Sequence, residues 1–538
     1  MKKTLLIGAA LFAGICATAQ NLNPTVEVTN TYVREATGID KPVQKMEVPD
    51  SVMRFNLDFD YSVRSTPYMG SYEFKPYFVQ LRPQPRPGTE GKLFVRAGAG
   101  YTLRPEATVV WSPIQKGNFR LNLYADHESF FGQFKGIGLQ DNRLVDNGNR
   151  VKGNQMRTQV GADALFGWNS GRLTAGVAYT NIGAHVGERG PFPHHFFLAN
   201  ARIQSLPNTK FSYSLGTKLS FMGGYLAENH SFTDGHIGGN FGIHHVWLGA
   251  SFEHVSTDGK FGGDVAVSPH YLLEVGRFHM DLGVKVSVAL NNQNPDFYPT
   301  KAGYVFPDAY VSFDAVPDAL VLYTSATGGH HMNVYSDYLD TKPFMAVVQG
   351  LWDTSIERAN VNLGLRGSVA GRFSYDVRGG WVWWQNAFLY GYDYNACIFD
   401  YIKFMNQFYA KADLAWSTSF MELGAKVDVR HSILKDDEEN STIDRLLAPP
   451  VFTGQFRALY KWGGRLRAGV TLDARTASVG TQMTMPGFAD LGLLAEFDMS
   501  SRVGLWLKAG NLLNATIQRV PGFAMHGPWF TIGATFDL

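Results

Sequence analysis

The strongest constraint on this chain is a run in which apolar residues alternate strictly with polar or charged ones. Between positions 421 and 430 the odd-numbered residues are apolar: Met421, Leu423, Ala425, Val427 and Val429. The residues between them are Glu422, Gly424, Lys426, Asp428 and Arg430. Such alternation predicts a β-strand, because successive side chains of a strand point to opposite faces. One face of this strand is apolar and the other carries charges of both signs.

The length of these runs favours a membrane protein over a soluble sandwich. The pattern returns at 452–460 and again at 466–475, after the tight turn Gly463-Gly464. Each run lasts about ten residues, which is the length of a tilted strand that crosses a bilayer. Strands of soluble proteins average about 5–6 residues. Long strands that are apolar outside and polar inside predict a transmembrane antiparallel β-barrel.

Turn signals set the expected number of strands. Ten short turns are predicted at 113–118, 169–171, 206–209, 242–244, 276–277, 316–318, 370–371, 417–419, 463–464 and 500–502. Ten hairpins and one further strand at each end give about 22 strands, an even number within the range 20–22. Longer connections, expected outside the cell, are predicted at 127–153, 183–195, 291–303, 328–356, 385–403 and 432–450.

The N-terminal region differs in character from the rest. Residues 1–19 have the form of a secretory signal peptide, with Lys2-Lys3, an apolar segment and small residues ending at Ala19. Lipidation of Cys16 is an alternative, although Ile15 is bulky for such a site. We predict a periplasmic, Pro-rich segment over 20–91 and an outer-membrane barrel over 92–538. Cleavage near Ala19 leaves Cys397 as the sole thiol, which excludes an intrachain disulfide.

The polar face of the strands predicts which side chains line the lumen. The charged residues at such positions are Asp281, Lys285, Asp376, Arg378, Lys411, Asp413, Lys426, Asp428, Arg430, Arg467, Asp473 and Arg475. They form either the mixed-charge wall of a wet channel or cross-strand ion pairs that only make the interior polar. A lumen of this width leaks unless in-folded loops, the 20–91 segment or a partner closes it. A girdle at the lipid interface is predicted for Trp381, Trp383, Trp384, Trp462 and Trp506.

Other function classes find no support in the sequence. The net charge of +1 gives no basic footprint for nucleic acid. The chain has no G-x-S-x-G elbow, no H-E-x-x-H and no phosphate-binding glycine loop. Of its histidine pairs, His194-His195 and His330-His331 fall in predicted loops, yet no ligand set accompanies them. We therefore expect no enzyme activity, no cofactor and no metal.

The C-terminus resembles that of a known family. Thr531, Gly533, Phe536 and Leu538 occupy the polar, glycine and apolar positions of the outer-membrane assembly signal, with Leu in place of the commoner terminal Phe. Upstream, Asn511-Leu512-Leu513-Asn514 and Pro521-Gly522 resemble the end of TonB-dependent receptor barrels. The resemblance implies a 22-stranded barrel in the outer membrane. That family carries a plug domain of well over a hundred residues, whereas only 20–91 precedes the barrel here, so a plugless member is expected.

Two functions follow from these observations. The first is passage or uptake of a solute through the outer membrane, together with a lipoprotein or periplasmic partner. The second is a non-transporting barrel that scaffolds an envelope-assembly or surface complex. In either case the chain meets outer-membrane lipid and the outer-membrane assembly machinery, and no nucleic acid.

Overall fold

The computed structural model describes residues 92–538, apart from 188–192, 207–209, 225, 258–259, 291–302, 318, 340–353, 394–395 and 436–445. The elements are β1 (Leu93–Tyr101), β2 (Glu106–Lys116), β3 (Phe119–Gln140), β4 (Arg143–Trp168), β5 (Gly171–Val186), β6 (His194–Ser205), β7 (Phe211–Gly224), β8 (Glu228–Phe241), β9 (His244–Thr257), β10 (Lys260–Val275), β11 (Phe278–Leu290), β12 (Gly303–Val316), β13 (Leu320–Met332), α3 (Tyr335–Leu339), β14 (Thr354–Val369), β15 (Phe373–Asp393), β16 (Ala396–Ser417), β17 (Met421–Lys435), β18 (Phe452–Trp462), β19 (Leu466–Arg475), β20 (Ser478–Val479), β21 (Thr484–Met485), β22 (Phe488–Asp498), β23 (Val503–Gly510), β24 (Gln518–Val520), β25 (Phe523–Ala524) and β26 (Trp529–Asp537).

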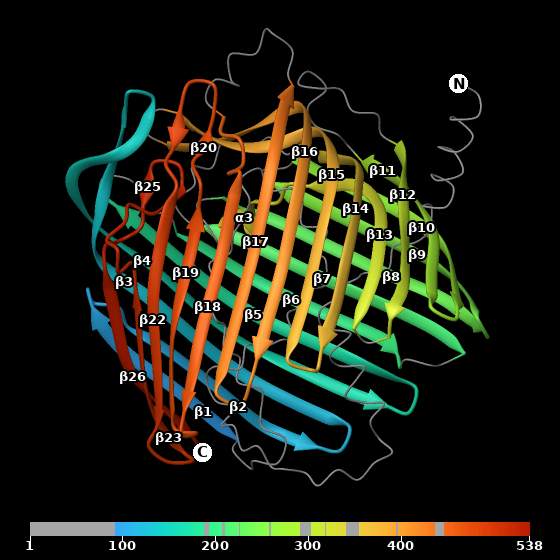
Figure 1. Ribbon diagram of the computed structural model, residues 1–538, viewed down its shortest axis with the longest axis horizontal. Coiled ribbons are helices and arrows are strands. Elements are labelled where there is room, and N and C mark those ends of the chain that lie inside the picture. The colour runs from blue at the N-terminus through green and yellow to red at the C-terminus, as the bar shows by residue number, and fades with distance from the viewer. Residues whose placement is uncertain are drawn as a thin grey trace.

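The strands form one closed antiparallel barrel (Figure 1). Consecutive long strands pair along the chain, β19 pairs with β22, and β23 pairs with β26. The barrel closes where β26 pairs with β1, from Phe94–Asp537 to Tyr101–Phe530. Leaving out the two-residue strands β20 and β21, the wall has 22 strands. The predicted architecture and strand number are confirmed.

Nine of the ten predicted short turns coincide with the connection between two strands that pair with each other, and the tenth, 113–118, begins inside β2 and ends at its connection to β3. The connection from β18 to β19 is typical: Gly463 and Gly464 have φ angles of 57° and 72°. Both values lie in the left-handed region that a two-residue hairpin needs and that glycine adopts without strain. Since outer-membrane barrels have their short turns on the periplasmic side, this end of the barrel defines the periplasmic rim.

The alternation seen in the sequence separates the two surfaces of the wall. On β17, Leu423 and Val429 are exposed, whereas Asp428 and Arg430 between and beside them are buried. Exposed apolar side chains recur on every second residue of the neighbouring strands, for example Phe408 and Val470. The outer surface therefore suits lipid, and the polar face encloses the interior.

Two of the predicted outer loops are strands instead. The expected loop 127–153 is the outer half of the β3–β4 hairpin, which turns at Asp141-Asn142. The expected loop 385–403 lies almost wholly within the β15–β16 ladder, which reaches Asp393–Ala396. The sequence does not reveal these outer parts of the strands as strands, because neither of their faces meets lipid. The alternation of apolar and polar residues is therefore absent from them. In β15, residues 386–392 are buried on both faces.

The remaining predicted outer connections are shorter than expected or lie partly outside the described residues. The 183–195 connection shrinks to the gap between β5 and β6, and the 328–356 connection begins with the end of β13 and contains α3. Most of 291–303 and half of 432–450 are outside the described part of the chain, as are the signal peptide and the 20–91 segment. Among the described residues, no helix is long and apolar enough to span a membrane.

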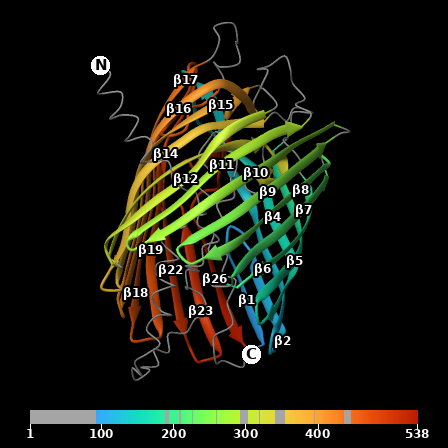
Figure 2. The ribbon, with the colours of Figure 1, turned by 90° about the vertical axis from the view of Figure 1, so that its right-hand side faces the viewer.

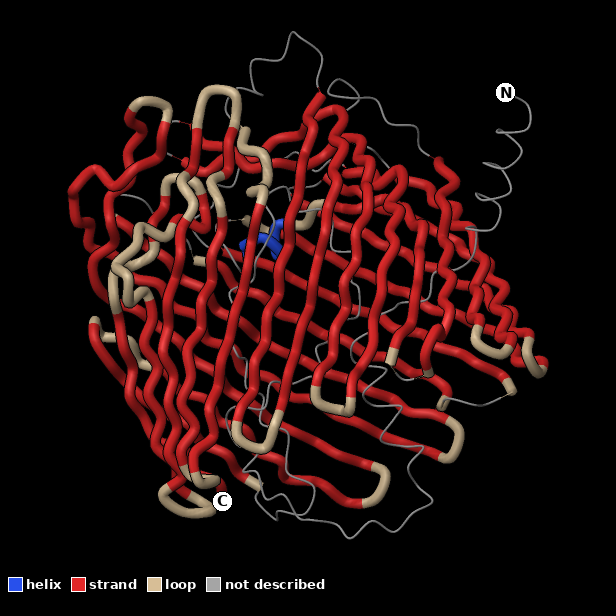
Figure 3. The backbone as a smooth tube through the Cα atoms, in the orientation of Figure 1, coloured by secondary structure: helices blue, strands red, loops and turns tan. Residues whose placement is uncertain are grey.

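The apolar core lies inside the outer mouth of the barrel rather than along its axis. Side views show the outer ends of β15, β16 and β17 curving over the mouth (Figure 2). The short helix α3 lies within the outline of the barrel, between the front and back walls (Figure 3). The outer mouth is thus the place where segments far apart in the sequence meet.

Candidate functional site: the barrel lumen and its outer mouth

Charged side chains of β16 and β17 face each other across the two strands. In the register of this pair, Asp413 lies opposite Lys426 and Lys411 lies opposite Asp428. Both ammonium–carboxylate distances are 3.7 Å. Arg430 Nη2 lies 2.6 Å from Asp428 Oδ2, and both side chains are buried. Directly opposed unlike charges stabilise a sheet, so these residues support the wall as well as its polarity.

The next strand continues this ladder with like charges opposed. Asp376 of β15 lies opposite Asp413, and Arg378 lies opposite Lys411. Like charges directly opposite each other are unfavourable, while each has an unlike charge on the diagonal. Asp376 is buried and accepts a hydrogen bond of 2.6 Å from the Tyr323 hydroxyl. The Tyr323 hydroxyl gives Asp376 the favourable partner that Asp413, directly opposite it, cannot provide.

A second charged group lies on β19 and β22. Arg467 lies opposite Glu496 in the register, with Nε 3.5 Å from the carboxylate, and its Nη2 lies 2.9 Å from Asp498. Asp473 and Arg475, also on β19, contact the β24–β25 hairpin. On this side of the wall Arg467 and Asp473 lie in ion pairs, whereas Arg475 donates to a backbone carbonyl.

The two remaining predicted residues lie on β11. Asp281 is buried, and its Oδ1 lies 2.7 Å from Nδ1 of His270, whose Nε2 lies 3.2 Å from Asp308. Lys285 lies beside the backbone of β13: a Cβ added to Gly329 would come within 2.8 Å of its Nζ. Of the two interpretations left open by the sequence, ion pairing and hydrogen bonding describe the contacts of most of these side chains.

The largest of the four buried apolar clusters among the described residues lies in the outer mouth, and we call it the mouth cluster. It joins the inward faces of β3, β5, β6 and β7 on one side of the barrel to β15 and β16 on the other, through α3 and the β24–β25 hairpin. Its members are Phe130, Phe134, Ile182, Ala184, Phe196, Met222, Leu226, Tyr335, Tyr338, Leu339, Phe388, Tyr390, Cys397, Tyr401, Val520 and Phe523. In-folded loops thus occupy the mouth, which is one of the three closures expected from the sequence.

One buried carboxylate anchors α3 inside the mouth. The Oε2 and Oε1 atoms of Glu228 accept hydrogen bonds from the backbone N–H groups of Tyr335 and Ser336, at 2.8 and 2.9 Å. Lys218 and Asp337 form a further ion pair of 3.7 Å. Two donors at the start of α3 are thereby satisfied by a side chain of the opposite wall.

The environment of Glu228 sets its protonation. The outward residues beside it on β8, Asn229 and Ser231, are polar, so this end of the strand lies above the apolar belt. Burial raises the pKa of Glu228 to about 7, while the hydrogen bonds from Ser336 and Tyr335 oppose that rise. Near neutral pH the anchor therefore exists in both protonation states.

The β24–β25 hairpin is held by charges of the wall. Arg519 Nη2 lies 2.6 Å from Asp473 and 3.6 Å from Asp490. Arg475 donates to the carbonyl of Gln518, and the Gln518 amide donates to the carbonyl of Leu144 at 2.7 Å. Two of the predicted lumen charges, Asp473 and Arg475, thus fix a loop rather than line an open channel.

The Asn-Leu-Leu-Asn motif starts this inward turn. Asn511 and Asn514 have φ angles of 47° and 50°, which asparagine tolerates better than most residues. The Asn511 backbone N–H donates to Asp490 at 2.9 Å, and its side-chain amide donates to the carbonyls of Ala515 and His526. The motif therefore directs the chain from the end of β23 into the mouth.

The assembly signal lies on the closing strand, β26. Phe536 and Leu538 are exposed on the outer face, and Thr531 is buried on the inner face. Gly533 is required by close packing, because an added Cβ would lie 2.1 Å from the Ala97 carbonyl and 2.5 Å from the Trp506 ring. Gly533 lies opposite Gly98 of β1, and the Trp506 indole packs against both. The ring fits there because neither residue has a side chain.

The predicted tryptophan girdle is partly wrong. Trp462 is 70% exposed, as a lipid-interface residue would be. Trp506 is 2% exposed and faces inward, with the Arg96 guanidinium 4.0 Å from its ring centre. Trp384 is also buried, with its ring 5.1 Å from that of His331. Position near a strand end did not indicate the face, which depends on the parity of the residue along the strand.

Histidine pairs lie in strands rather than loops. His194 begins β6 and is buried, while His195 on the opposite face lies 2.7 Å from the Tyr179 hydroxyl. His330 and His331 belong to β13. Within the described residues, no three His, Cys, Asp or Glu side chains are grouped as metal ligands.

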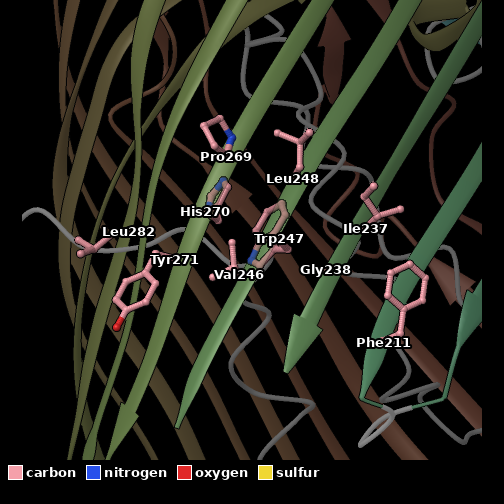
Figure 4. A pocket seen from close by; sticks show the side chains of 10 residues that line it. All are labelled: Phe211, Ile237, Gly238, Val246, Trp247, Leu248, Pro269, His270, Tyr271 and Leu282. Carbon is pink, nitrogen blue, oxygen red and sulfur yellow. The ribbon is translucent and has the colours of Figure 1, made fainter. Parts of the chain in front are cut away.

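An apolar groove of about 590 Å³ lies on the outer surface, away from the lumen (Figure 4). Exposed side chains of β7, β8, β9 and β10 border it, among them Phe211, Ile237, Leu248 and Tyr271. Phe211 follows directly on a short turn, so the groove lies toward the periplasmic rim. Its apolar border faces lipid and carries no chemistry of its own.

Neither a protein-family model nor a curated protein sequence matches the chain. Solved structures do match it. The FrpB iron transporter of Neisseria meningitidis superposes with a TM-score of 0.60 at 10% identity, over 83% of this chain and 81% of FrpB. The chain has the barrel fold of the TonB-dependent receptors. This receptor-like barrel also matches the ferric enterobactin receptor PfeA of Pseudomonas aeruginosa, with a TM-score of 0.58 at 10% identity over 83% and 81% of the two chains.

A third match is the ferric-catecholate import receptor Fiu of E. coli K12, with a TM-score of 0.56 at 10% identity over 85% and 82% of the two chains. At these identities the similarity concerns the fold. A barrel of this kind resides in the outer membrane, and the matched proteins are described as transporters and receptors rather than enzymes.

Sequence reasoning missed the residues that close the mouth. Glu228 and Arg519 stood in no motif, and Tyr335–Leu339 lay in a predicted loop noted only for its aromatic residues. A signal did exist for β15 and β16, since a strand with apolar residues on both faces indicates burial on both sides. No sequence signal pairs Glu228 with backbone groups more than a hundred residues away.

Proposed function

We propose that this receptor-like barrel passes a solute across the outer membrane and that its own loops gate the outer mouth. The observation that carries the proposal is the mouth cluster, in which α3 joins opposite walls of the lumen. A barrel of this many strands is wide enough for a solute or a plug. A closure held by a small helix and one carboxylate is suited to release, whereas a purely structural filling would need no such anchor.

A signal peptide directs export of the chain and is cleaved near Ala19, and the 20–91 segment acts at the periplasmic side in place of a full plug domain. A lipoprotein or periplasmic partner assists, and the outer-membrane assembly machinery inserts the barrel through its β26 signal. The wall charges not engaged by the β24–β25 hairpin, such as Lys411 and Asp413, keep the lumen polar for a water-soluble cargo.

Conductance of the purified protein in planar bilayers tests this function. The wild type is expected to be nearly silent, because the mouth is filled. The double variant Tyr335→Ala/Tyr338→Ala removes two fully buried rings from the mouth cluster and should give discrete conductance steps. Tyr460→Ala, at an exposed outward position, is the matched control and should stay silent.

The opposite outcome would support the scaffold. If the double variant keeps its folded barrel and remains silent, while both proteins co-purify with the same stable partners, transport is refuted. Conductance steps in the double variant that are absent from the wild type and the control support a solute-sized lumen closed by the mouth cluster.

A further inference from the structure

The wall is interrupted between β12 and β13, at a place we call the seam. The last pair of this ladder is Ala309–Ala326. Beyond it, β12 runs on to Gly303 paired with β11, and β13 runs on to Met332 paired with β14. Six residues on each side of the seam thus have no described partner across it. In every other strand pair of the described wall, the ladder of paired residues continues to within two residues of the end of at least one of the two strands.

The sequence at the seam disfavours pairing. Pro307, which would be next but one on β12, has no backbone N–H to donate. Opposite it, Gly328 and Gly329 accompany a shift in the register of β13 against β14. Proline within a sheet is otherwise confined to edge strands and bulges, so both sides of the seam have the residues of an edge.

β13 leaves the wall at this point and enters the lumen. Residues 329–332 are all buried, although alternate residues of a wall strand should face lipid. His330 Nδ1 lies 2.8 Å from Asp264 Oδ1 of β10 and 2.9 Å from Ser287 Oγ of β11. The end of β13 thus crosses the inner side of two strands that are not its neighbours.

The outer border of the seam lies in the apolar belt. Val305 on β12 is 69% exposed, and Val284, Val286 and Val288 on the adjoining β11 are exposed as well. Unpaired backbone groups cost several kcal/mol each in hydrocarbon. Among the described residues, the Phe306 side chain lies across the seam: it is 2% exposed, and a Cβ on Gly328 would come within 2.9 Å of its ring.

The inner border is polar. Ser287, Asp264 and His330 form a buried hydrogen-bonded group directly behind the seam. The Arg358 guanidinium, from the bulge of β14, lies 4.4 Å from the ring centre of Tyr304 on β12. A molecule in the seam would therefore meet hydrocarbon at one end and hydrogen-bonding and charged groups at the other.

We propose that the seam is a lateral passage between the lumen and the outer leaflet for an amphiphile with an acyl chain. The chain lies between β12 and β13 toward the lipid, and the polar head lies at Ser287, His330 and Arg358. Displacement of Phe306 and of the β13 end opens the route. This route differs from axial passage of a water-soluble cargo and does not depend on it.

Photo-cross-linking of the full chain tests the proposal. The protein with Cys397→Ala, Asp308→Cys and Thr327→Cys is reconstituted in phospholipid vesicles that contain a diazirine-bearing fatty acid. Residues 308 and 327 would be the next pair across the seam, and a reversible bis-thiosulfonate linker joins them. The matched control carries Asp314→Cys and Val321→Cys, which are paired within the intact ladder.

Adducts are mapped by peptide mass spectrometry. We expect adducts on inward Phe306 and His330 in the unlinked protein, lost when the seam is linked, restored by reductant and unaffected by the control link. Adducts on outward Val305 should persist throughout. The proposal is overturned if adducts occur only on outward residues, if linking the seam leaves the inward adducts in place, or if they appear equally at Ser220, a buried inward residue of β7 behind a continuous ladder.

Discussion

The protonation of Glu228 should control whether the outer mouth is closed. When α3 is seated, the carboxyl group is buried and its pKa is about 7; when α3 is released, water reaches the group and its pKa returns toward 4.5. Between these two pH values the seated state holds a proton that the released state gives up. Seating is therefore favoured at low pH, weakens as the pH rises from 4.5 to 7, and changes little above 7.

The expected size follows from the two pKa values. Each unit of pKa corresponds to about 1.4 kcal/mol, so seating should lose roughly 3 kcal/mol across this window. That loss changes the released population by about two orders of magnitude, provided that release exposes the carboxylate fully. The two hydrogen bonds from Tyr335 and Ser336 favour the charged carboxylate, and the pKa of about 7 already includes their opposing effect.

Cys397 provides the assay. Its thiol is fully buried in the mouth cluster, so a water-soluble maleimide labels it only after the mouth opens. Thiols react faster at higher pH, so each Cys397 labelling rate is divided by the rate of the Glu228→Gln variant at the same pH. The glutamine side chain of this variant stays neutral at every pH. The ratio should rise steeply between pH 4.5 and 7 and level off above. A ratio that stays flat across this window would refute the role of Glu228.

Three further predictions concern separate parts of the barrel. Tyr338→Ala removes a fully buried ring, which costs about 3–5 kcal/mol and should speed maleimide labelling of Cys397 by at least about a hundredfold, while Tyr460→Ala leaves it unchanged. Gly533→Val places atoms against the Ala97 carbonyl and the Trp506 ring, so heat-modifiable folded barrel should be lost on gels; Gly424→Val, with open space at its Cβ, should assemble normally. Arg519→Ala leaves Asp473 and Asp490 without their shared cation, so limited proteolysis should cut within 511–528, and normal resistance there would contradict the assigned contact. Adding Asp473→Asn to Arg519→Ala should restore part of that resistance, since about 1–3 kcal/mol of the loss comes from the uncompensated charge.

Residues whose surroundings repeat along the barrel could be placed from the sequence. The faces of β17, β18 and β19 and the ten short turns follow from alternation and from turn residues such as Gly463-Gly464, because lipid outside and water inside impose the same rule on every strand. The C-terminal motif likewise indicates a receptor-like barrel from the sequence alone. None of these inferences needed knowledge of which strands meet across the lumen.

Contacts across the lumen were decided by the tertiary structure alone. Whether Trp506 faces lipid or Arg96, whether 385–403 is a loop or a strand, and which backbone groups Glu228 accepts from depend on segments far apart in the sequence. The pattern of apolar and polar residues along a strand indicates only whether each face of the strand meets an apolar or a polar environment. Where protein covers both sides, as at the outer mouth and behind the seam, the alternation that reveals a wall strand is absent, and only the folded chain shows what lies there.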